Sequence, residues 1–223
     1  AESWPESDLA WINSPSNPTG RVHSESELKS AIKYSRTHKT AVISDECYLE
    51  FGNTVEPQSI LKFTQGQNSN ILAVHSLSKR SSMAGYRGAF VIGDSALIKK
   101  ILEIRKHAGM MVPLPIQHAM IAALSDDKHV AIQRDRYNKR RQQLIPALES
   151  IGFTIDFSDA GLYIWCTRGE DSWKSVEALA KLGILVTPGI FYGPDGGEHV
   201  RIAMTATDEA IADAVNRITA SKA

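Results

Sequence analysis

The chain has 223 residues, 25 Lys and Arg against 25 Asp and Glu, and a hydrophobic content of 43%. This composition is that of an ordinary globular protein, and the zero net charge argues against an electrostatic role on nucleic acid or an anionic membrane. Two distant cysteines argue against a disulfide scaffold and favour a cytoplasmic location, and the scattered histidines predict no metal site.

The first half of the chain alternates predicted strands and helices. Four apolar runs predict strands, at residues 9–13, 41–43, 71–74 and 89–92. A helix should begin at Ser24, because Ser24 and Glu27 form a capping box, and a second helix is predicted over residues 95–107. The strands show no polar alternation, which is typical of a sheet covered on both faces. We therefore expect an α/β fold with a mostly parallel sheet and flanking helices.

The second half has a different pattern of shorter elements. We predict helices at residues 116–124, 126–150, 173–181 and 207–221, and strands at residues 153–155, 162–165, 184–186 and 200–202. The basic cluster from Arg134 to Arg141 contains Asp135 and is interpreted as a solvated helix face. We place a boundary near residue 130 and predict two domains, residues 1–130 and a small α+β domain over residues 131–223.

Reactive and polar side chains follow the predicted strands. Lys79 comes after the strand at residues 71–74, so we expect it to follow a buried strand rather than to lie on a helix. Hydroxyl groups flank it at Ser76 and Ser78, and Arg87 follows eight residues after Lys79. These groups supply an amine and several ligands suited to a phosphate.

Three further side chains follow earlier strands. Asp45 lies just beyond the strand at residues 41–43, Tyr48 comes three residues later, and Asn17 lies in the turn after the first strand. Open α/β sheets bind ligands at the carboxyl ends of their parallel strands. We therefore expect these side chains to gather at one ligand site.

The whole set meets the chemical needs of pyridoxal phosphate. An amine such as Lys79 can hold the aldehyde as a Schiff base and move a proton, and the Asp45 carboxylate can stabilise the protonated ring nitrogen. Tyr48 and Asn17 can donate to the ring oxygen. Each group has an ordinary alternative when taken alone, such as a turn at Asn17, a helix cap at Asp45 or a polar loop at Ser76. The order and spacing of the full set favour the cofactor.

With these motifs in place, the chain resembles the class I/II pyridoxal phosphate-dependent aminotransferases of fold type I. The resemblance runs from about residue 9 to the C-terminus and is carried by five segments, Asn17–Gly20, Asp45–Tyr48, Ser76–Lys79, Gly85–Arg87 and Arg201–Ala203. It implies that Lys79 is the catalytic lysine that carries the cofactor, that Asp45 partners the ring nitrogen, and that Arg201 binds the substrate α-carboxylate.

The resemblance also implies the remaining roles. Tyr48 and Asn17 would donate to the ring oxygen, and the phosphate would be bound by Ser76, Ser78 and Arg87. Residues 1–130 would be the C-terminal part of the cofactor-binding large domain, and residues 131–223 the small domain that closes over substrate. Amino acids and 2-oxo acids would be the substrates of a full-length enzyme that is a homodimer.

A narrower resemblance points to the actinobacterial type of N-succinyldiaminopimelate aminotransferase, which serves lysine and diaminopimelate synthesis. It is carried by residues 74–79, 105–113, 158–163 and 203–209. Members of the family carry a long segment before the Asn17–Gly20 motif, so we expect this chain to be the C-terminal portion of a longer enzyme, with little turnover alone.

Alternative functions stay open at this point. Another class I/II aminotransferase or a β-lyase of the same fold would share the motifs, and only substrate profiling separates these. A non-catalytic effector-binding module is a second class, although retention of Arg201 with the whole cofactor set favours catalysis. A purely structural α/β domain leaves the ordered motifs unexplained.

Overall fold

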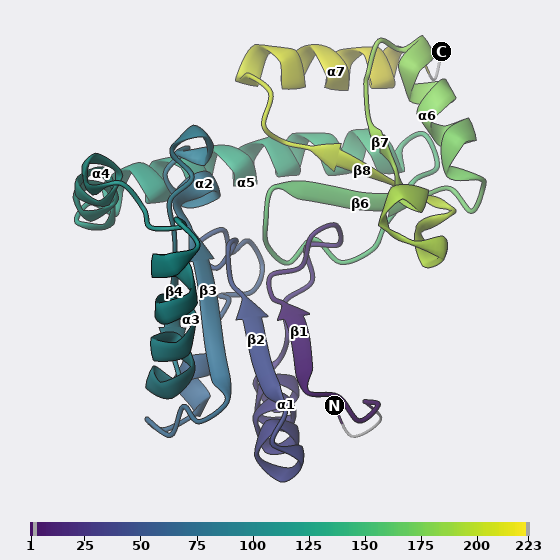
Figure 1. The fold of residues 1–223 in the computed structure, drawn as a ribbon. Coiled ribbons are helices and arrows are strands. Elements are labelled where there is room, and N and C mark those ends of the chain that lie inside the picture. The colour runs from purple at the N-terminus through teal and green to yellow at the C-terminus, as the bar shows by residue number, and fades with distance from the viewer. Residues whose placement is uncertain (2–3, 222–223) are drawn as a thin grey trace. The chain divides into compact units, whose positions relative to one another are not determined.

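Two compact units make up the computed structural model, which describes residue 1 and residues 4–221 (Figure 1). Unit 1 comprises Ala1–Pro15, Val22–Glu50 and Glu56–Ala131, and unit 2 comprises Ser16–Arg21, Phe51–Val55 and Ile132–Ala223. Two short stretches of the first half of the sequence therefore belong to the unit formed mainly by the second half. No helix of the described residues is long and apolar enough to cross a membrane. Nor do these residues contain a group of three or more side chains suited to hold a metal ion.

Unit 1 is built on a four-stranded sheet in the order β1-β2-β3-β4. Its strands are β1 (Leu9–Asn13), β2 (Ala41–Asp45), β3 (Ile71–Ser76) and β4 (Ala89–Gly93). The first three are parallel, which confirms the predicted α/β class with a mostly parallel sheet. β4 runs antiparallel to β3, with Ser76 opposite Ala89, so a sheet that is parallel throughout would be wrong.

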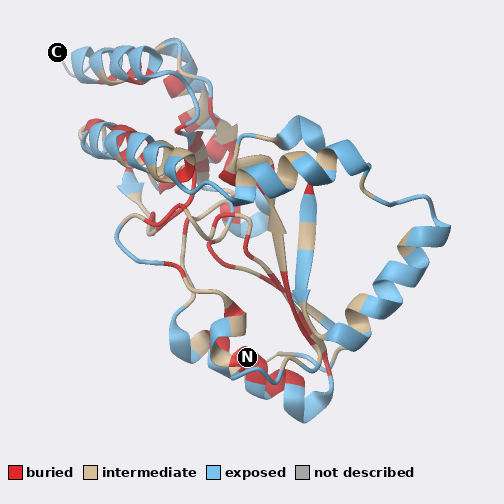
Figure 2. Cartoon of the chain, turned by 90° about the vertical axis from the view of Figure 1, so that its left-hand side faces the viewer, coloured by how far each residue is buried: buried red, intermediate tan, exposed pale blue. Residues whose placement is uncertain are grey.

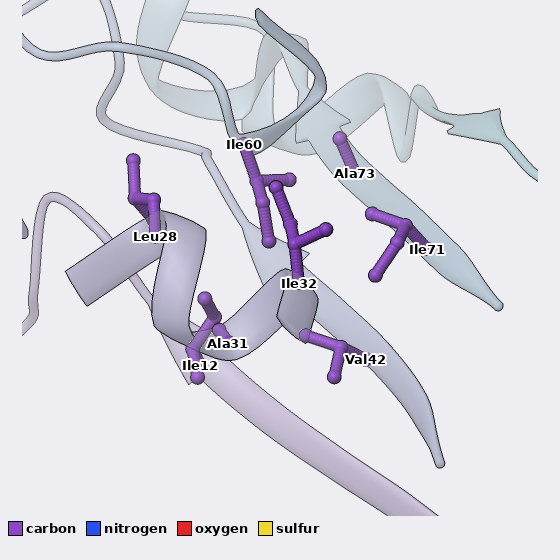
Figure 3. Close-up of a cluster of buried hydrophobic side chains, with 8 residues drawn as sticks. All are labelled: Ile12, Leu28, Ala31, Ile32, Val42, Ile60, Ile71 and Ala73. Carbon is purple, nitrogen blue, oxygen red and sulfur yellow. The ribbon is translucent and has the colours of Figure 1, made fainter. Parts of the chain in front are cut away.

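The core of unit 1 lies between this sheet and α1 (Glu25–His38). The predicted capping box is present, because Ser24 accepts from the Glu27 amide while the Glu27 carboxylate accepts from the Ser24 amide. The apolar side of α1 and the 3-10 turn η1 (Ile60–Phe63) pack on the central strands (Figure 3). The cluster consists of Ile12, Leu28, Ala31, Ile32, Val42, Ile60, Ile71 and Ala73.

The two helices that come directly after β4 are far less buried than α1. Neither α3 (Ser95–His107) nor α4 (Leu114–Leu124) contains a buried residue, in contrast to α1 (Figure 2). α3 has the predicted bounds, whereas α4 begins two residues earlier than predicted because a proline is accepted in the first helical turn. A largely apolar cavity of about 610 Å³ lies beside β4, and Arg87 is among the residues that line it.

Unit 2 contains an antiparallel sheet in the order β5-β6-β8-β7. Its strands are β5 (Thr154–Ile155), β6 (Tyr163–Thr167), β7 (Thr187–Pro188) and β8 (His199–Ala203). Its helices are α5 (Lys128–Glu149, whose first turn belongs to unit 1), α6 (Ser172–Lys181) and α7 (Asp208–Ala220), with the 3-10 turns η3 (Gly189–Tyr192) and η4 (Pro194–Gly196).

Two predictions for unit 2 are wrong. Residues 184–186 are not a strand, because the Ile184 amide completes the end of α6 by bonding to Leu179, and pairing with β8 starts only at Thr187. The basic cluster on α5 is not wholly solvated either. Arg140 is 8% exposed and Arg141 is 1% exposed, so two of its arginines belong to the interior.

Candidate functional site

Lys79 lies on α2 (Leu77–Arg80), a single helical turn that follows β3 directly. The expectation that it would follow a strand is confirmed, but its placement off any helix is wrong. Ser76 caps the turn: its hydroxyl accepts from the Ser78 amide at 3.1 Å and contacts the Ser78 hydroxyl at 2.8 Å. The Lys79 ammonium is half-buried and forms no hydrogen bond or ion pair with the residues that the structure describes.

Arg80 fixes this turn to the rest of unit 1, and sequence reasoning missed it. Its guanidinium is buried and donates to Glu50 Oε1 and to the Ala123 carbonyl, both at 2.8 Å, and it forms an ion pair with Asp127. A buried guanidinium with several acceptors holds a segment in one geometry. The neighbour of Lys79 in sequence therefore anchors the turn that carries the amine.

Asp45 and Lys79 are close to one thiol. The parallel register places Asp45 opposite Val74, three residues before the start of the lysine turn, and Asp45 Oδ1 accepts from the Cys47 amide at 3.1 Å. Burial raises the pKa of the Cys47 thiol to about 12, and both the hydrogen bond to Asp45 and the negative charge of Asp45 add to this rise. The positive charge of Lys79 lowers the same pKa. Amine and carboxylate thus share one neighbourhood.

A buried carboxylate–imidazole pair lies next to these groups, and sequence reasoning missed it as well. Glu46 is 1% exposed, and its Oε1 accepts from the Ile60 amide at 2.8 Å. Its Oε2 faces His75 Nε2 at 3.1 Å as an ion-pair contact without a well-aligned hydrogen bond. The His75 ring stacks on Phe90 of β4. Tyr48, in the turn after β2, is buried.

The backbone at Arg87 lies near the lysine turn because β4 is reversed. The Leu77 amide bonds to the Gly88 carbonyl at 3.1 Å, and the Ser76 hydroxyl lies 3.5 Å from the same carbonyl, so the backbone next to Arg87 lies at the start of α2. In a parallel β4 of five residues, Arg87 would lie at the opposite edge of the sheet, roughly 17 Å away. Its side chain is exposed, and Nη1 donates to the Ala84 carbonyl at 2.8 Å.

The remaining two predicted site residues belong to unit 2, where they contact each other. Arg201 Nη1 donates to Asn17 Oδ1 at 2.9 Å. The guanidinium carbon lies 3.9 Å from the centre of the Tyr163 ring and 5.0 Å from that of Tyr192. Arg201 Nε is buried and has no hydrogen-bond partner among the described residues. An arginine clamped by two aromatic rings and an amide keeps a fixed direction.

Each unit therefore offers a distinct chemistry. Unit 1 presents an amine, a carboxylate that acts on the same thiol as that amine, two serine hydroxyls and an arginine, which match an aldehyde, a cationic ring nitrogen and a phosphate. Unit 2 presents a guanidinium, the group that binds a carboxylate in a planar, bidentate fashion.

Comparison with known proteins gives the family. The family model described as aminotransferase class I and II matches residues 2–218. A probable aminotransferase of Mycobacterium tuberculosis is 55% identical over 213 residues, 95% of this chain and 51% of that protein. The 4-dedimethylamino-4-oxo-anhydrotetracycline transaminase of Streptomyces rimosus is 53% identical, over 95% of this chain and 59% of that protein. An LL-diaminopimelate aminotransferase of Dehalococcoides mccartyi is 32% identical, over 94% of this chain and 55% of that protein.

Solved structures agree with this result. An aromatic aminotransferase from Pyrococcus horikoshii aligns with a TM-score of 0.88 at 28% identity, covering 99% of this chain and 61% of that chain. An aminotransferase from Neisseria meningitidis aligns with a TM-score of 0.88 at 32% identity, covering 96% of this chain and 57% of that chain. The chain thus spans between half and two thirds of the length of these relatives.

Proposed function

We propose that this chain, which belongs to the class I and II aminotransferase family, takes part in the pyridoxal phosphate-dependent transfer of an amino group between an amino acid and a 2-oxo acid. The observation that carries the proposal is the shared neighbourhood of Lys79, Asp45 and the Cys47 thiol in unit 1. The amine would hold the cofactor ring covalently at one end and the carboxylate would contact its opposite end, so the two groups must lie in one neighbourhood.

The donors of unit 1 fit the cofactor that members of this family use. When bound, pyridoxal phosphate accepts the electron pair of the bond that breaks at the substrate α-carbon. Lys79 would hold the cofactor covalently, and its amine would move the proton at the α-carbon. Asp45 would keep the ring nitrogen protonated. Tyr48 and Asn17 would donate to the ring oxygen.

The phosphate and the substrate would be bound by charged and hydroxyl groups. Ser76 and Ser78, already hydrogen-bonded to each other, would bind the phosphate together with Arg87. Arg201 would bind the substrate α-carboxylate. Its clamp supports this role, because a guanidinium held by Tyr163 and Tyr192 loses little freedom on binding.

For the substrate, we propose N-succinyldiaminopimelate, with glutamate and 2-oxoglutarate as the donor pair of lysine and diaminopimelate synthesis. The 32% identity to an LL-diaminopimelate aminotransferase supports this substrate class. The 53% identity to the 4-dedimethylamino-4-oxo-anhydrotetracycline transaminase supports a different substrate, a polycyclic ketone. Rates for both substrates, measured with the enzyme that contains this chain, decide between them. Turnover of the polycyclic ketone alone would overturn the diaminopimelate assignment.

The organisation of the enzyme is part of the same proposal. Residues 1–130 would belong to its cofactor-binding domain and residues 131–223 to its smaller domain. We propose a cytoplasmic homodimer as its working form. The two free cysteines of the chain support a reducing compartment.

Borohydride reduction in the presence of pyridoxal phosphate, followed by peptide mapping, tests the central claim. We expect label on Lys79, loss of that label in Lys79→Arg, and no loss in Lys100→Arg, which changes an exposed lysine of α3. Label spread evenly over surface lysines would contradict the site. Label on Lys79 without amino transfer by the longer enzyme would favour a non-catalytic effector-binding module.

A further inference from the structure

An arginine of α5 is fully buried and has no carboxylate partner among the described residues. Arg141 is 1% exposed, and among the described residues its guanidinium bonds only to neutral acceptors. Nε donates to Ser158 Oγ at 3.0 Å, Nη1 to Asn138 Oδ1 at 2.6 Å and Nη2 to the Gly161 carbonyl at 2.6 Å. Burial lowers the pKa of Arg141 to about 10. Burying an unpaired cation is costly, so this residue needs a reason beyond filling space.

Two of the three bonds of Arg141 hold a strained loop. Phe157 and Ser158 have φ values of 64° and 95°, a left-handed conformation that side chains other than glycine rarely adopt. Gly161, at the other end of the loop, has a φ of 84°. Arg141 bonds to both Ser158 and Gly161 and therefore fixes the loop from beneath. Strained segments persist only where their surroundings hold them in place.

The same loop supports the turn that carries Asn17. The Ala160 amide donates to the Gly20 carbonyl at 3.0 Å. A Cβ at Gly20 would lie 2.7 Å from the Ala160 oxygen, so the two backbones are in close contact. The turn is closed by the Ser16 amide bonding to the Arg21 carbonyl. Its position therefore depends on the loop that Arg141 fixes.

The Asn17 turn and the strand that follows the loop at residues 157–161 both contact Arg201. Asn17, on the supported turn, accepts a hydrogen bond from the Arg201 guanidinium. Tyr163, two residues beyond Gly161, stacks under the same guanidinium at 3.9 Å. All of these residues belong to unit 2.

We propose that Arg141 is a positioning residue for Arg201, acting through the loop at residues 157–161. Its three-way fork sets the loop, and the loop sets the amide and the ring that clamp Arg201. The consequence for carboxylate binding rests on the proposed function. The consequence for the geometry of Arg201 does not.

The first test needs no cofactor. Protons of an arginine stacked on a tyrosine ring are shifted by the ring current, so the Arg201 side chain should give a displaced signal in arginine-labelled NMR spectra, assigned with Arg201→Lys. We expect Arg141→Met to abolish the displacement. Arg141→Lys keeps the charge but not the fork, and should restore it only in part. A displaced Arg201 signal that survives in both variants would overturn the proposal.

Arg140→Met is the matched control. Arg140 is also buried on α5, but it bonds to Asp208 at 2.6 Å and to the Met204 carbonyl at 2.9 Å. The Arg140→Met variant should therefore destabilise unit 2 but leave the Arg201 signal displaced as in the wild type. An Arg201 signal lost equally in the Arg140 and Arg141 variants would show that general loosening is the cause, against our proposal. If Arg141→Met does not fold, Arg141→Lys carries the same comparison.

A second measurement separates this proposal from the function itself. In the cofactor-loaded enzyme that contains this chain, Arg141→Met should raise KM for the amino acid on the order of tenfold, with a smaller change in kcat. An unchanged KM in Arg201→Lys would refute carboxylate binding at Arg201, while the NMR result would still decide the role of Arg141. A raised KM in Arg201→Lys alone, with Arg141→Met unchanged, would refute positioning by Arg141.

Discussion

Replacing Asp45 with Asn should make the Cys47 thiol more reactive. With a pKa of about 12, this thiol is ionised in about one molecule in 10,000 at pH 8, and only the thiolate reacts. Burial is the largest cause of the raised pKa and remains in the variant. Removing the charge of Asp45 and weakening its hydrogen bond, since Asn keeps only a neutral amide oxygen, should lower the pKa of Cys47 by roughly half to one unit, a rise of about three- to tenfold in reaction rate.

Lys79→Met should act in the opposite direction, because the charge of Lys79 lowers the pKa of Cys47. The assay is alkylation by iodoacetamide at pH 8, resolved for each cysteine by peptide mass. Cys166 provides an internal reference, since burial also raises its pKa to about 12 and it lies in the other unit. Equal Cys47 rates in the wild type and both variants, relative to Cys166, would show that amine and carboxylate do not share one neighbourhood. The cofactor site of unit 1 would then be wrong.

Three further predictions concern stability. Gly20→Ala should lower the unfolding free energy, measured in urea, by about 2–4 kcal/mol, because φ is +74° and the new Cβ would lie 2.7 Å from a carbonyl oxygen. Gly152→Ala is the control, because φ is +89° there but the space around the new Cβ is open, so it should cost only the backbone strain. Equal losses in the two variants would contradict the close contact at Gly20. Arg80→Met should cost about 2 kcal/mol, less than a fully buried pair because Glu50 is 42% exposed, and a neutral result in the same assay would remove its anchoring role. Because the pKa of Cys166 is raised to about 12 in the folded state, the protonated thiol stabilises the fold; this contribution is complete below about pH 9 and is lost as the pH rises towards 12. Cys166→Ala should flatten the resulting decline in unfolding free energy, which is at most about 4 kcal/mol. An unchanged slope of stability against pH would refute the raised pKa.

The local pattern of the sequence predicted most of the elements that carry the candidate site. Apolar runs located β1, β2 and β3 because their sequences show no polar alternation, although β1 is not covered on both faces, since Leu9 and Trp11 are more than half exposed. The capping box located the start of α1 because Ser24 and Glu27 satisfy the first amides of the helix locally. Both signals depend on neighbours in sequence.

The direction of β4 had no such signal. A short apolar run is the same in a parallel and in an antiparallel strand, so the run at residues 89–92 could not reveal the reversal. The reversal nevertheless decides where Arg87 lies. The sequence motif named Arg87 as a phosphate ligand, but only the antiparallel register explains how the backbone next to it comes to lie close to Ser76.

Arg141 shows a deeper limit of sequence reasoning. Within α5 its charged neighbours make a solvated face the natural interpretation, since charged helical residues are usually exposed. Its burial depends on acceptors at Ser158 and Gly161, which lie 17 and 20 residues away and become available only when the loop takes left-handed backbone angles. A helical pattern contains no information about those angles. A buried cation with neutral partners therefore marks a place where tertiary structure overrides local preference, and such places are where we expect positioning residues of a site to be found.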